Sequence, residues 1–475
     1  MHSKRHLFDI FFSIAVLILL PIGFVTMRGY NSDSIYSLSQ ARDIIQFGSL
    51  SGWIYSAVPF IFPDVILSIP LANLHSSPYV FYLISSPIQI TMFIFLYSIY
   101  RSRIDQEKSW IEVLVATTIA AVFLAFVGSA LLRDAYYSVV ETFFVFVHHG
   151  FAAMFAIIFF LFFTANDFFE IKRSPLIFTV LLGLMVASDF YFGLYFGLLL
   201  VSTFNFKNWK KVFIVSTSFG ILSIAIFLLS WWLNPSLRLQ VLNSSSPSEY
   251  DQLQVLFLLM GILLVPTASF IFLIYKKSCP AQIKNLYVAL TLTILLIFFG
   301  GLIKDKYAFR YIAIAYPISI ILLAQFILFL SEKNRFLLLL LSGVFVSAFT
   351  FVSIFYGGHK SSHIYRNEIS CLNKINRPHS NLVAQYWPAK VIFESTGRQF
   401  NLWQVDGNLK AFDWINNKKW ETLYPDNGVI LLVKEGFNNE VTDKFTSQSD
   451  TTLVCDGKIL LIKGTVSEIL PITFK

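Results

Sequence analysis

The chain has 475 residues, of which 56% are hydrophobic and only 13% are charged, and its formal net charge is +8 at pH 7. A soluble protein of this length would need far more charged surface, so the composition excludes that class and indicates that most of the chain faces lipid. The basic balance does not indicate a nucleic-acid partner, because the Lys and Arg residues fall in short clusters between apolar runs and no nucleic-acid-binding module is present.

The first segment, MHSKRH, is basic, and the apolar run 7–27 follows it. A cleaved signal peptide is one interpretation, but no small-x-small cleavage site follows the run. The run is also long enough to span a bilayer, so we expect a retained first transmembrane helix.

Apolar runs of spanning length recur along the chain, near 78–100, 111–132, 147–165, 211–233, 253–275, 285–303, 311–331 and 336–356. The segment 174–206 has basic clusters on both sides, and a single crossing would place one of them on the outer side. Two short helices that turn at Ser188-Asp189-Phe190 would keep both clusters inside. The sequence therefore predicts about eleven transmembrane helices, with the N-terminus inside and the C-terminus outside.

The composition changes to mixed polar and apolar residues after Tyr356. The segments NLVAQYW, FNLWQVDG, GVILLVKE and TLVCDGKILLIKG predict short strands separated by turns. We therefore expect a polytopic α-helical membrane domain over 1–356, with a first outer loop at 28–77, and a soluble α/β domain over 357–475. Cys371 and Cys455 lie in the outer domain, where they form a disulfide or remain two buried thiols.

This topology gathers most of the candidate site residues on the outer face. They include Asp33 and Asp64 in the first loop, Arg133 and Asp134 in the second, His149 at the start of the fourth span, Asp189 in the third loop, and Lys304, Lys306 and Arg310 in the fifth. A transporter would instead place its polar groups near the bilayer midplane, on broken helices repeated in both halves. The 174–206 pair is a candidate broken element, but the sequence shows no clear internal repeat.

The first loop predicts an amphipathic helix along the membrane surface, because Ile35, Leu38, Ala41, Ile44 and Ile45 recur at helical spacing. Asp33 stands just before this helix, where it could cap the helix or take part in catalysis. Asp64 follows Pro63, where it is a turn residue or part of a site.

The tandem His148-His149 favours interfacial polar groups over metal ligands, because no carboxylate stands at a metal-binding spacing. Lys304, Lys306 and Arg310 lie within seven residues of an outer loop, against the positive-inside trend. They predict a site for a lipid phosphate, with salt bridging to Asp305 as the alternative.

Together these features resemble the GT-C superfamily of integral-membrane glycosyltransferases. The resemblance is carried by an acidic residue in a long first outer loop (GYNSDSIYSLSQARDI), the FPD segment, the RDAYY and KDKYAFRY loops and an outer C-terminal domain. Within the superfamily the layout is most similar to bacterial O-antigen-modifying enzymes, such as the serotype-converting glucosyltransferases. Asp33 stands alone between serines, where many members have a paired or extended acidic motif.

The resemblance implies transfer of a sugar from a polyprenyl-phosphate donor to a glycan or lipid-linked acceptor, at the outer face of a bacterial cytoplasmic membrane. It implies Asp33 as the catalytic base, and Lys304, Lys306, Arg310 and Arg133 as ligands of the donor phosphate. Asp64, Asp134, His149, Asp189 and Tyr36 would contact the sugar or the acceptor. No set of residues specifies a metal ion. The sequence therefore allows either a divalent cation or no cofactor at all.

Two other functions fit the same layout. One is a transporter or flippase of lipid-linked saccharides, and the other is a membrane scaffold whose outer domain binds a cell-wall component. The sequence does not specify the sugar, the acceptor or the oligomeric state.

Overall fold

A computed structural model describes residues 2–28, 32–55, 58–74, 77–104, 108–144, 149–164, 175–203, 209–233, 251–277, 279–303, 306–329, 332–358, 364–375, 377–412, 415–437, 440, 443 and 451–466. The chain divides into two compact units. The helical unit comprises Met1–Val25, Ser85–Leu233 and Val241–Ile354, and the α/β unit comprises Thr26–Ile84, Asn234–Gln240 and Phe355–Lys475. The first loop was expected to belong to the membrane domain, whereas its contacts group it with the C-terminal domain.

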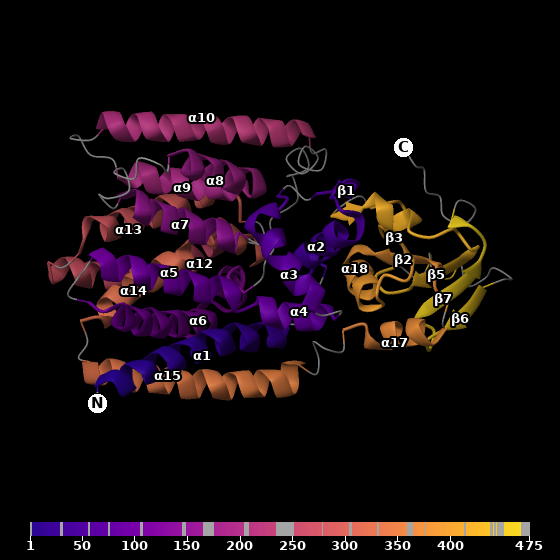
Figure 1. The fold of residues 1–475 in the computed structure, drawn as a ribbon, viewed down its shortest axis with the longest axis horizontal. Helices are drawn as coiled ribbons and strands as arrows, with labels where there is room; N and C mark the ends of the chain where they lie inside the picture. Colours follow the sequence, from indigo (N-terminus) through magenta and orange to yellow (C-terminus); the bar gives the residue numbers. More distant parts are fainter. Residues whose placement is uncertain are drawn as a thin grey trace. The chain divides into compact units, whose positions relative to one another are not determined.

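The helical unit consists of helices that run side by side (Figure 1). They are α1 (His2–Arg28, up to Val25), α5 (Ile88–Ile104), α6 (Trp110–Glu141), α7 (Gly150–Thr164), α8 (Pro175–Ser188), α9 (Phe190–Ser202), α10 (Trp209–Leu233), α12 (Gln252–Tyr275), α13 (Ala281–Phe299), the 3₁₀-helix η3 (Lys306–Ile312), α14 (Ala315–Ile327) and α15 (Glu332–Val352). In α14 almost every side chain is buried, and the Tyr316 hydroxyl donates to the Ala121 carbonyl of α6 at 2.9 Å. This helix therefore forms the centre of the unit.

Among the described residues, six helical segments are long and apolar enough to cross a membrane. They are Lys4–Met27, Pro78–Ile104, Trp110–Ala130, Gln252–Tyr275, Ala281–Phe299 and Asn334–Gly357. Shorter apolar helices, among them Gly150–Phe162, Phe190–Ser202 and Ala315–Ile327, lie within other predicted spans. The chain is therefore a helical, membrane-associated protein, and a full set of eleven crossings stays a prediction.

The break predicted within 174–206 is confirmed. Helix α8 ends at Ser188 and α9 begins at Phe190, with Asp189 in extended backbone between them. The Asp189 carboxylate accepts a hydrogen bond from Tyr191 N at 3.0 Å and so caps α9.

The α/β unit combines the first loop with the C-terminal residues. Its first-loop elements are α2 (Tyr36–Phe47), β1 (Trp53–Ile54), the irregular turn η1 (Ile61–Val65), α3 (Ile66–Leu74) and α4 (Pro78–Ser85, up to Ile84). Its C-terminal elements are α17 (Arg366–Ile375), β2 (Asn381–Gln385), α18 (Tyr386–Ser395), β3 (Asn401–Val405), β4 (Asn416–Asn417), η5 (Lys418–Thr422), β5 (Val429–Val433), β6 (Thr451–Val454) and β7 (Ile459–Lys463). The turn η4 (Ser353–Gly358) leads into them.

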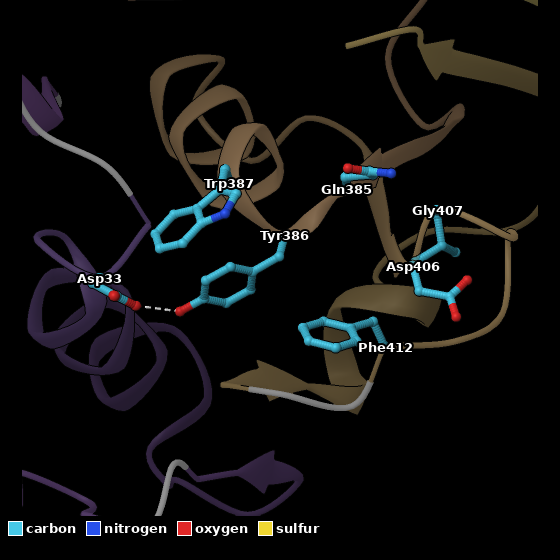
Figure 2. A pocket seen from close by; sticks show the side chains of 8 residues that line it. Asp33, Gln385, Tyr386, Trp387, Asp406, Gly407 and Phe412 are labelled. Carbon is cyan, nitrogen blue, oxygen red and sulfur yellow. Dashed lines mark hydrogen bonds between the residues drawn. The ribbon is translucent and has the colours of Figure 1, made fainter. Parts of the chain in front are cut away.

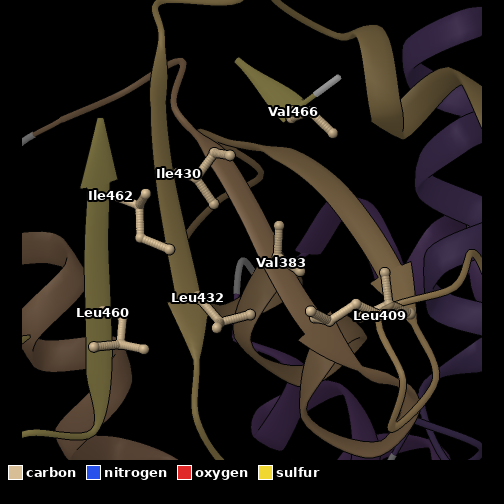
Figure 3. Close-up of a cluster of buried hydrophobic side chains, with 8 residues drawn as sticks. Val383, Leu409, Ile430, Leu432, Leu460, Ile462 and Val466 are labelled. Carbon is tan, nitrogen blue, oxygen red and sulfur yellow. The ribbon is translucent and has the colours of Figure 1, made fainter. Parts of the chain in front are cut away.

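The five-stranded sheet has the order β3-β2-β5-β7-β6, in which β2 is parallel to β3 and β5, and β7 is antiparallel to β5 and β6. Every strand predicted from the sequence is present. A buried cluster lies on one face of the sheet (Figure 3), formed by Val383, Val405, Leu409, Ile430, Leu432, Leu460, Ile462 and Val466. The alternate residues, such as Leu382, Leu402 and Leu431, are also buried, as expected for the parallel part of a sheet.

Helix α2 is present where the periodicity predicts it, but its polar face is not exposed. Its polar residues Ser37, Gln40 and Asp43 are fully buried, whereas the apolar Ile45 is 46% exposed. Nearby, β1 pairs with β4, so that Trp53 lies opposite Asn417. The polar face of α2 packs against the C-terminal residues, and the position of this helix relative to a membrane stays a prediction.

Cys371 in α17 and Cys455 after β6 form a disulfide, with Cα atoms 5.6 Å apart. Cys279 is a free thiol in the helical unit. The disulfide closes a segment of 84 residues that contains most of the sheet.

Candidate functional site

Asp33 lies against the beginning of α18. Its side-chain oxygen Oδ1 accepts a hydrogen bond from the Tyr386 hydroxyl. The adjacent Ser32 Oγ donates to the carbonyl oxygens of Tyr386 at 2.7 Å and of Trp387 at 2.8 Å. The cap residue of α2 is Ile35, which makes no side-chain cap hydrogen bond. The 32–33 segment is therefore fastened to the first turn of α18.

The sequence QYWPAK explains how α18 presents its aromatic residues. Strand β2 ends at Gln385 and α18 begins at Tyr386. Pro388 stands in the first turn, where a helix does not need the backbone N–H that proline lacks. Tyr386 and Trp387 are thus placed at the carboxyl end of a strand, with their rings edge to face and 4.9 Å apart.

A cavity of about 440 Å³ opens beside Asp33 (Figure 2). Its lining consists of Asp33, Gln385, Tyr386, Trp387, Val405, Asp406, Gly407 and Phe412. Phe412 approaches the Tyr386 ring edge on at 5.8 Å, and Trp387 is 50% exposed. The volume falls within the usual range for small-molecule sites, and the lining combines aromatic faces with a carboxylate.

The cavity lies at the carboxyl ends of the parallel strands β2 and β3, which stop at Gln385 and Val405. Ligands of open α/β sheets commonly bind at this edge. The Gln385 side-chain amide donates to the Gly436 carbonyl at 2.8 Å, just beyond β5. Gly436 has φ +90°, and a Cβ at this position would overlap the Gln385 side chain, so the close approach requires glycine.

Lys390 is fully buried one turn into α18. Its Nζ atom lies 4.1 Å from the centroid of the Tyr386 ring and donates to Gln404 Oε1 at 3.2 Å. Burial lowers the pKa of Lys390 to about 7, although the nearby carboxylates Asp33 and Glu394 favour its charged form. The charged and neutral forms of this buried amine are therefore both accessible near neutral pH.

Asp43 has a different environment from Asp33. It is fully buried, and its carboxylate accepts hydrogen bonds from Trp53 Nε1 at 2.7 Å, Trp420 Nε1 at 3.0 Å, Asn417 Nδ2 at 2.5 Å and Arg398 Nη1 at 2.5 Å. Burial raises the pKa of Asp43, and Arg398 opposes that rise. These contacts join α2 to the C-terminal residues and leave the carboxylate no room for a ligand.

Glu394 extends the same buried network. It accepts from Arg42 Nη1 at 2.6 Å and from Arg398 Nη2 at 2.6 Å. Burial alone would raise the pKa of Glu394, but the Arg398 and Arg42 guanidiniums hold it at about 2. We call Asp43, Glu394, Arg42 and Arg398 the buried ion network.

In the helical unit, a second polar cluster forms where α7 and α9 begin. His149 Nδ1 lies 2.8 Å from Asp189 Oδ2, and both side chains are buried. The His149 ring packs on Tyr191 at 4.1 Å, and Tyr191 stacks in parallel on Tyr311 at 5.1 Å. The Arg310 guanidinium lies over the Tyr311 ring at 5.5 Å. The structure thus brings together three residues that the sequence predicted for the site, namely His149, Asp189 and Arg310.

Two other predicted residues are buried in the α/β unit. Tyr36 is 1% exposed, its hydroxyl accepts from Gln40 Nε2 at 2.9 Å, and its ring packs edge on against Trp53 at 5.4 Å. Asp64 in η1 is 3% exposed, and Ser68 Oγ donates to its backbone carbonyl at 2.8 Å. Neither residue lines the cavity next to Asp33.

The side chains of four predicted residues are not described by the structure. Lys304 lies outside the described residues, and the side chains of Lys306, Arg133 and Asp134 are likewise not described. Their proposed roles on the phosphate, the sugar or the acceptor stay predictions. Within the described part of the chain, no three His, Cys, Asp or Glu side chains gather to hold a metal ion.

The sequence prediction missed Tyr386, Trp387, Lys390 and Phe412 as site residues. A usable signal was present, because QYW closes a predicted strand and the carboxyl ends of parallel strands commonly form sites. The parallel pairing itself is not visible in the sequence.

Comparison with known proteins gave no match: no family model, no curated protein and no solved structure is significantly similar to the chain. The class that the fold defines is a helical membrane-associated protein with a compact α/β unit.

Proposed function

We propose that the protein is a membrane glycosyltransferase that uses a polyprenyl-phosphate sugar as donor, with Asp33 as the catalytic base. One observation carries the proposal: Asp33 lies on a cavity of about 440 Å³ that the aromatic residues Tyr386, Trp387 and Phe412 also line. Sugar rings pack their C–H faces on aromatic side chains and bind carboxylates through their hydroxyls. The cavity offers both kinds of contact side by side.

The reaction is a single displacement at the anomeric carbon. The acceptor oxygen forms a bond to that carbon while the bond from the carbon to the phosphate oxygen breaks. The Asp33 carboxylate takes the proton of the acceptor hydroxyl, and the electron pair of the broken bond leaves with the polyprenyl phosphate. The Tyr386 hydroxyl donates to Asp33 Oδ1 and so orients the carboxylate.

The cavity suits the acceptor sugar better than the donor phosphate. Its lining includes two carboxylate residues, Asp33 and Asp406, but no described Lys or Arg, and the Lys390 amine is buried against the Tyr386 ring. A phosphate would be repelled there. In this proposal Arg310, with Lys304, Lys306 and Arg133, binds the donor phosphate, while His149 and Asp189 orient the donor sugar.

The proposal places the reaction at the outer face of a bacterial cytoplasmic membrane, with the α/β unit outside. The acceptor would be a glycan or lipid-linked saccharide such as O-antigen. The apolar helices provide the surface for membrane lipids and for the polyprenyl chain.

The test uses full-length protein in liposomes supplied with radiolabelled polyprenyl-phosphate hexoses and lipid-linked oligosaccharide acceptors. We expect wild type to transfer label, and Asp33→Asn to lower the rate by about 10²- to 10⁴-fold, because a general base contributes roughly that factor. Asp456→Asn is the matched control, since Asp456 is an exposed turn residue after β6 and the charge change is the same. Equal transfer by wild type and Asp33→Asn would remove Asp33 from the base role.

A second function, movement of lipid-linked saccharides across the bilayer, is favoured by one observation. The buried His149–Asp189 pair lies at the joint of the two short apolar helices α8 and α9. Ionisable pairs at interrupted helices are typical of transport pathways. Translocation of labelled saccharide without any transfer would support this function over the first.

A further inference from the structure

Lys390 contacts two walls of the cavity from behind. On one side its Nζ atom lies under the face of the Tyr386 ring, at 4.1 Å from the centroid. On the other side it donates to Gln404 Oε1 at 3.2 Å, and Gln404 Nε2 donates in turn to the Phe412 carbonyl at 2.8 Å. Tyr386 and Phe412 both line the cavity, so a single buried amine braces both.

The Tyr386 ring connects Lys390 to Asp33. The hydroxyl end of the ring donates to Asp33 Oδ1, and the face of the ring lies on the Lys390 amine. An ammonium ion is attracted to an aromatic face, and the attraction is stronger where water is excluded. A neutral amine has no such attraction, so the charge of Lys390 affects how firmly the ring is held.

The charged groups that act on Lys390 are two carboxylates. Asp33 comes from the segment before α2, and Glu394 comes from the next turn of α18. Glu394 is already paired with Arg42 from α2 and with Arg398, each at 2.6 Å. Asp33 is therefore the carboxylate whose charge Lys390 balances most directly at the cavity.

We propose that Lys390 is a positioning residue: its ammonium form holds the Tyr386 ring so that the hydroxyl stays on Asp33, and its neutral form releases this arrangement. The inference concerns the cavity of the proposed function and rests on that function for its catalytic meaning. Burial lowers the pKa of Lys390 to about 7, so the release falls within an accessible pH range. The cavity is then ordered below neutral pH and loosened above it.

The test needs no donor or acceptor. Trp387, which packs edge to face on Tyr386 at 4.9 Å, is replaced by 5-fluorotryptophan in the full-length protein in lipid nanodiscs. We expect its ¹⁹F resonance to shift with pH with a midpoint near 7. The shift should be absent between about pH 5.5 and 9 in Lys390→Met, which is never charged, and in Lys390→Arg, which is always charged. Lys463→Met, at an exposed position on β7, is the matched control and should titrate like wild type.

Asp33→Asn leaves the buried Lys390 unchanged. It therefore tests the electrostatic link between Asp33 and Lys390 without a substitution in the protein core. Removing this neighbouring carboxylate should move the midpoint about one unit lower, because an opposite charge nearby favours the charged amine by roughly that amount. A titration that persists in Lys390→Met would overturn the proposal. So would a midpoint that does not change in Asp33→Asn.

The transfer assay then separates this inference from the proposed function. If the enzyme is a transferase, kcat should fall as the pH rises through about 7 in wild type, while Lys390→Arg keeps a flat profile at the high level. A flat wild-type profile in that range would contradict the positioning role. An absence of transfer, with the ¹⁹F titration as expected, would contradict the proposed function and leave the bracing role of Lys390 intact.

Discussion

Asp33 and Asp43 belong to the same first loop, and both are bonded by residues from the C-terminal half of the chain, yet their surroundings differ. Asp43 is fully buried and accepts hydrogen bonds from two indoles, an amide and a guanidinium. Asp33 is half-buried, accepts from the Tyr386 hydroxyl and borders a cavity. A carboxylate surrounded by donors holds a structure together, whereas one that borders a cavity can meet a substrate.

The largest expected effect on stability is that of the substitution Asp43→Ala, which tests the structural role of this carboxylate. The substitution leaves the Arg398 guanidinium and two indole N–H groups buried with one partner fewer. Breaking a buried ion pair from one side costs about 3–5 kcal/mol. We expect the free energy of unfolding to fall by that amount. The measurement is urea unfolding of the full-length protein in detergent, monitored by tryptophan fluorescence. Asp443→Ala, at an exposed helical position, should change stability by less than about 0.5 kcal/mol.

Acid should weaken the buried ion network through Glu394. The pKa of Glu394 in the folded protein is about 2, below its ordinary value of 4.5, so its stabilisation is complete above pH 4.5 and is lost as the pH falls through 2. The difference corresponds to about 3 kcal/mol at most. Unfolding curves recorded between pH 2 and 6 should show this slope in wild type, and Glu394→Gln should flatten it. A slope of the same size in both proteins would place the acid sensitivity elsewhere.

A smaller effect on stability is expected from Tyr386→Phe. The change removes one partly buried hydrogen bond, which contributes about 1 kcal/mol, while the ring still packs on Lys390. Transfer should fall more than stability does, because Asp33 loses the group that orients it. A stability loss as large as that of Asp43→Ala would mean that the two aspartates play the same role.

Local features of this fold were predictable from the sequence, and the pairings between distant segments were not. The strands from Asn381 onward, helix α2 and the break at Asp189 follow from periodicity and turn residues, which act over a few positions. The contact of Asp43 with Arg398 joins residues 355 positions apart, and no local pattern encodes it. For the same reason, the polar face of α2 was expected to contact solvent or lipid headgroups, whereas it is buried against the C-terminal residues.

The candidate site was predictable to a similar extent. Asp33 was chosen for its place in an outer loop, and the structure puts it on a cavity. Tyr36 was chosen as an aromatic residue nearby, and it is buried in the packing instead. Tyr386 and Trp387 close a predicted strand, but the parallel pairing that makes this position a candidate site is not visible in the sequence. Lys390 could be selected only once the start of α18 was known.

The most direct test of the central claim measures Asp33→Asn and Asp43→Asn side by side, for sugar transfer from polyprenyl-phosphate donors and for unfolding in urea. The account predicts that Asp33→Asn keeps near wild-type stability and loses transfer by about 10²- to 10⁴-fold, whereas Asp43→Asn loses stability first. Wild-type transfer by a folded Asp33→Asn protein would contradict it.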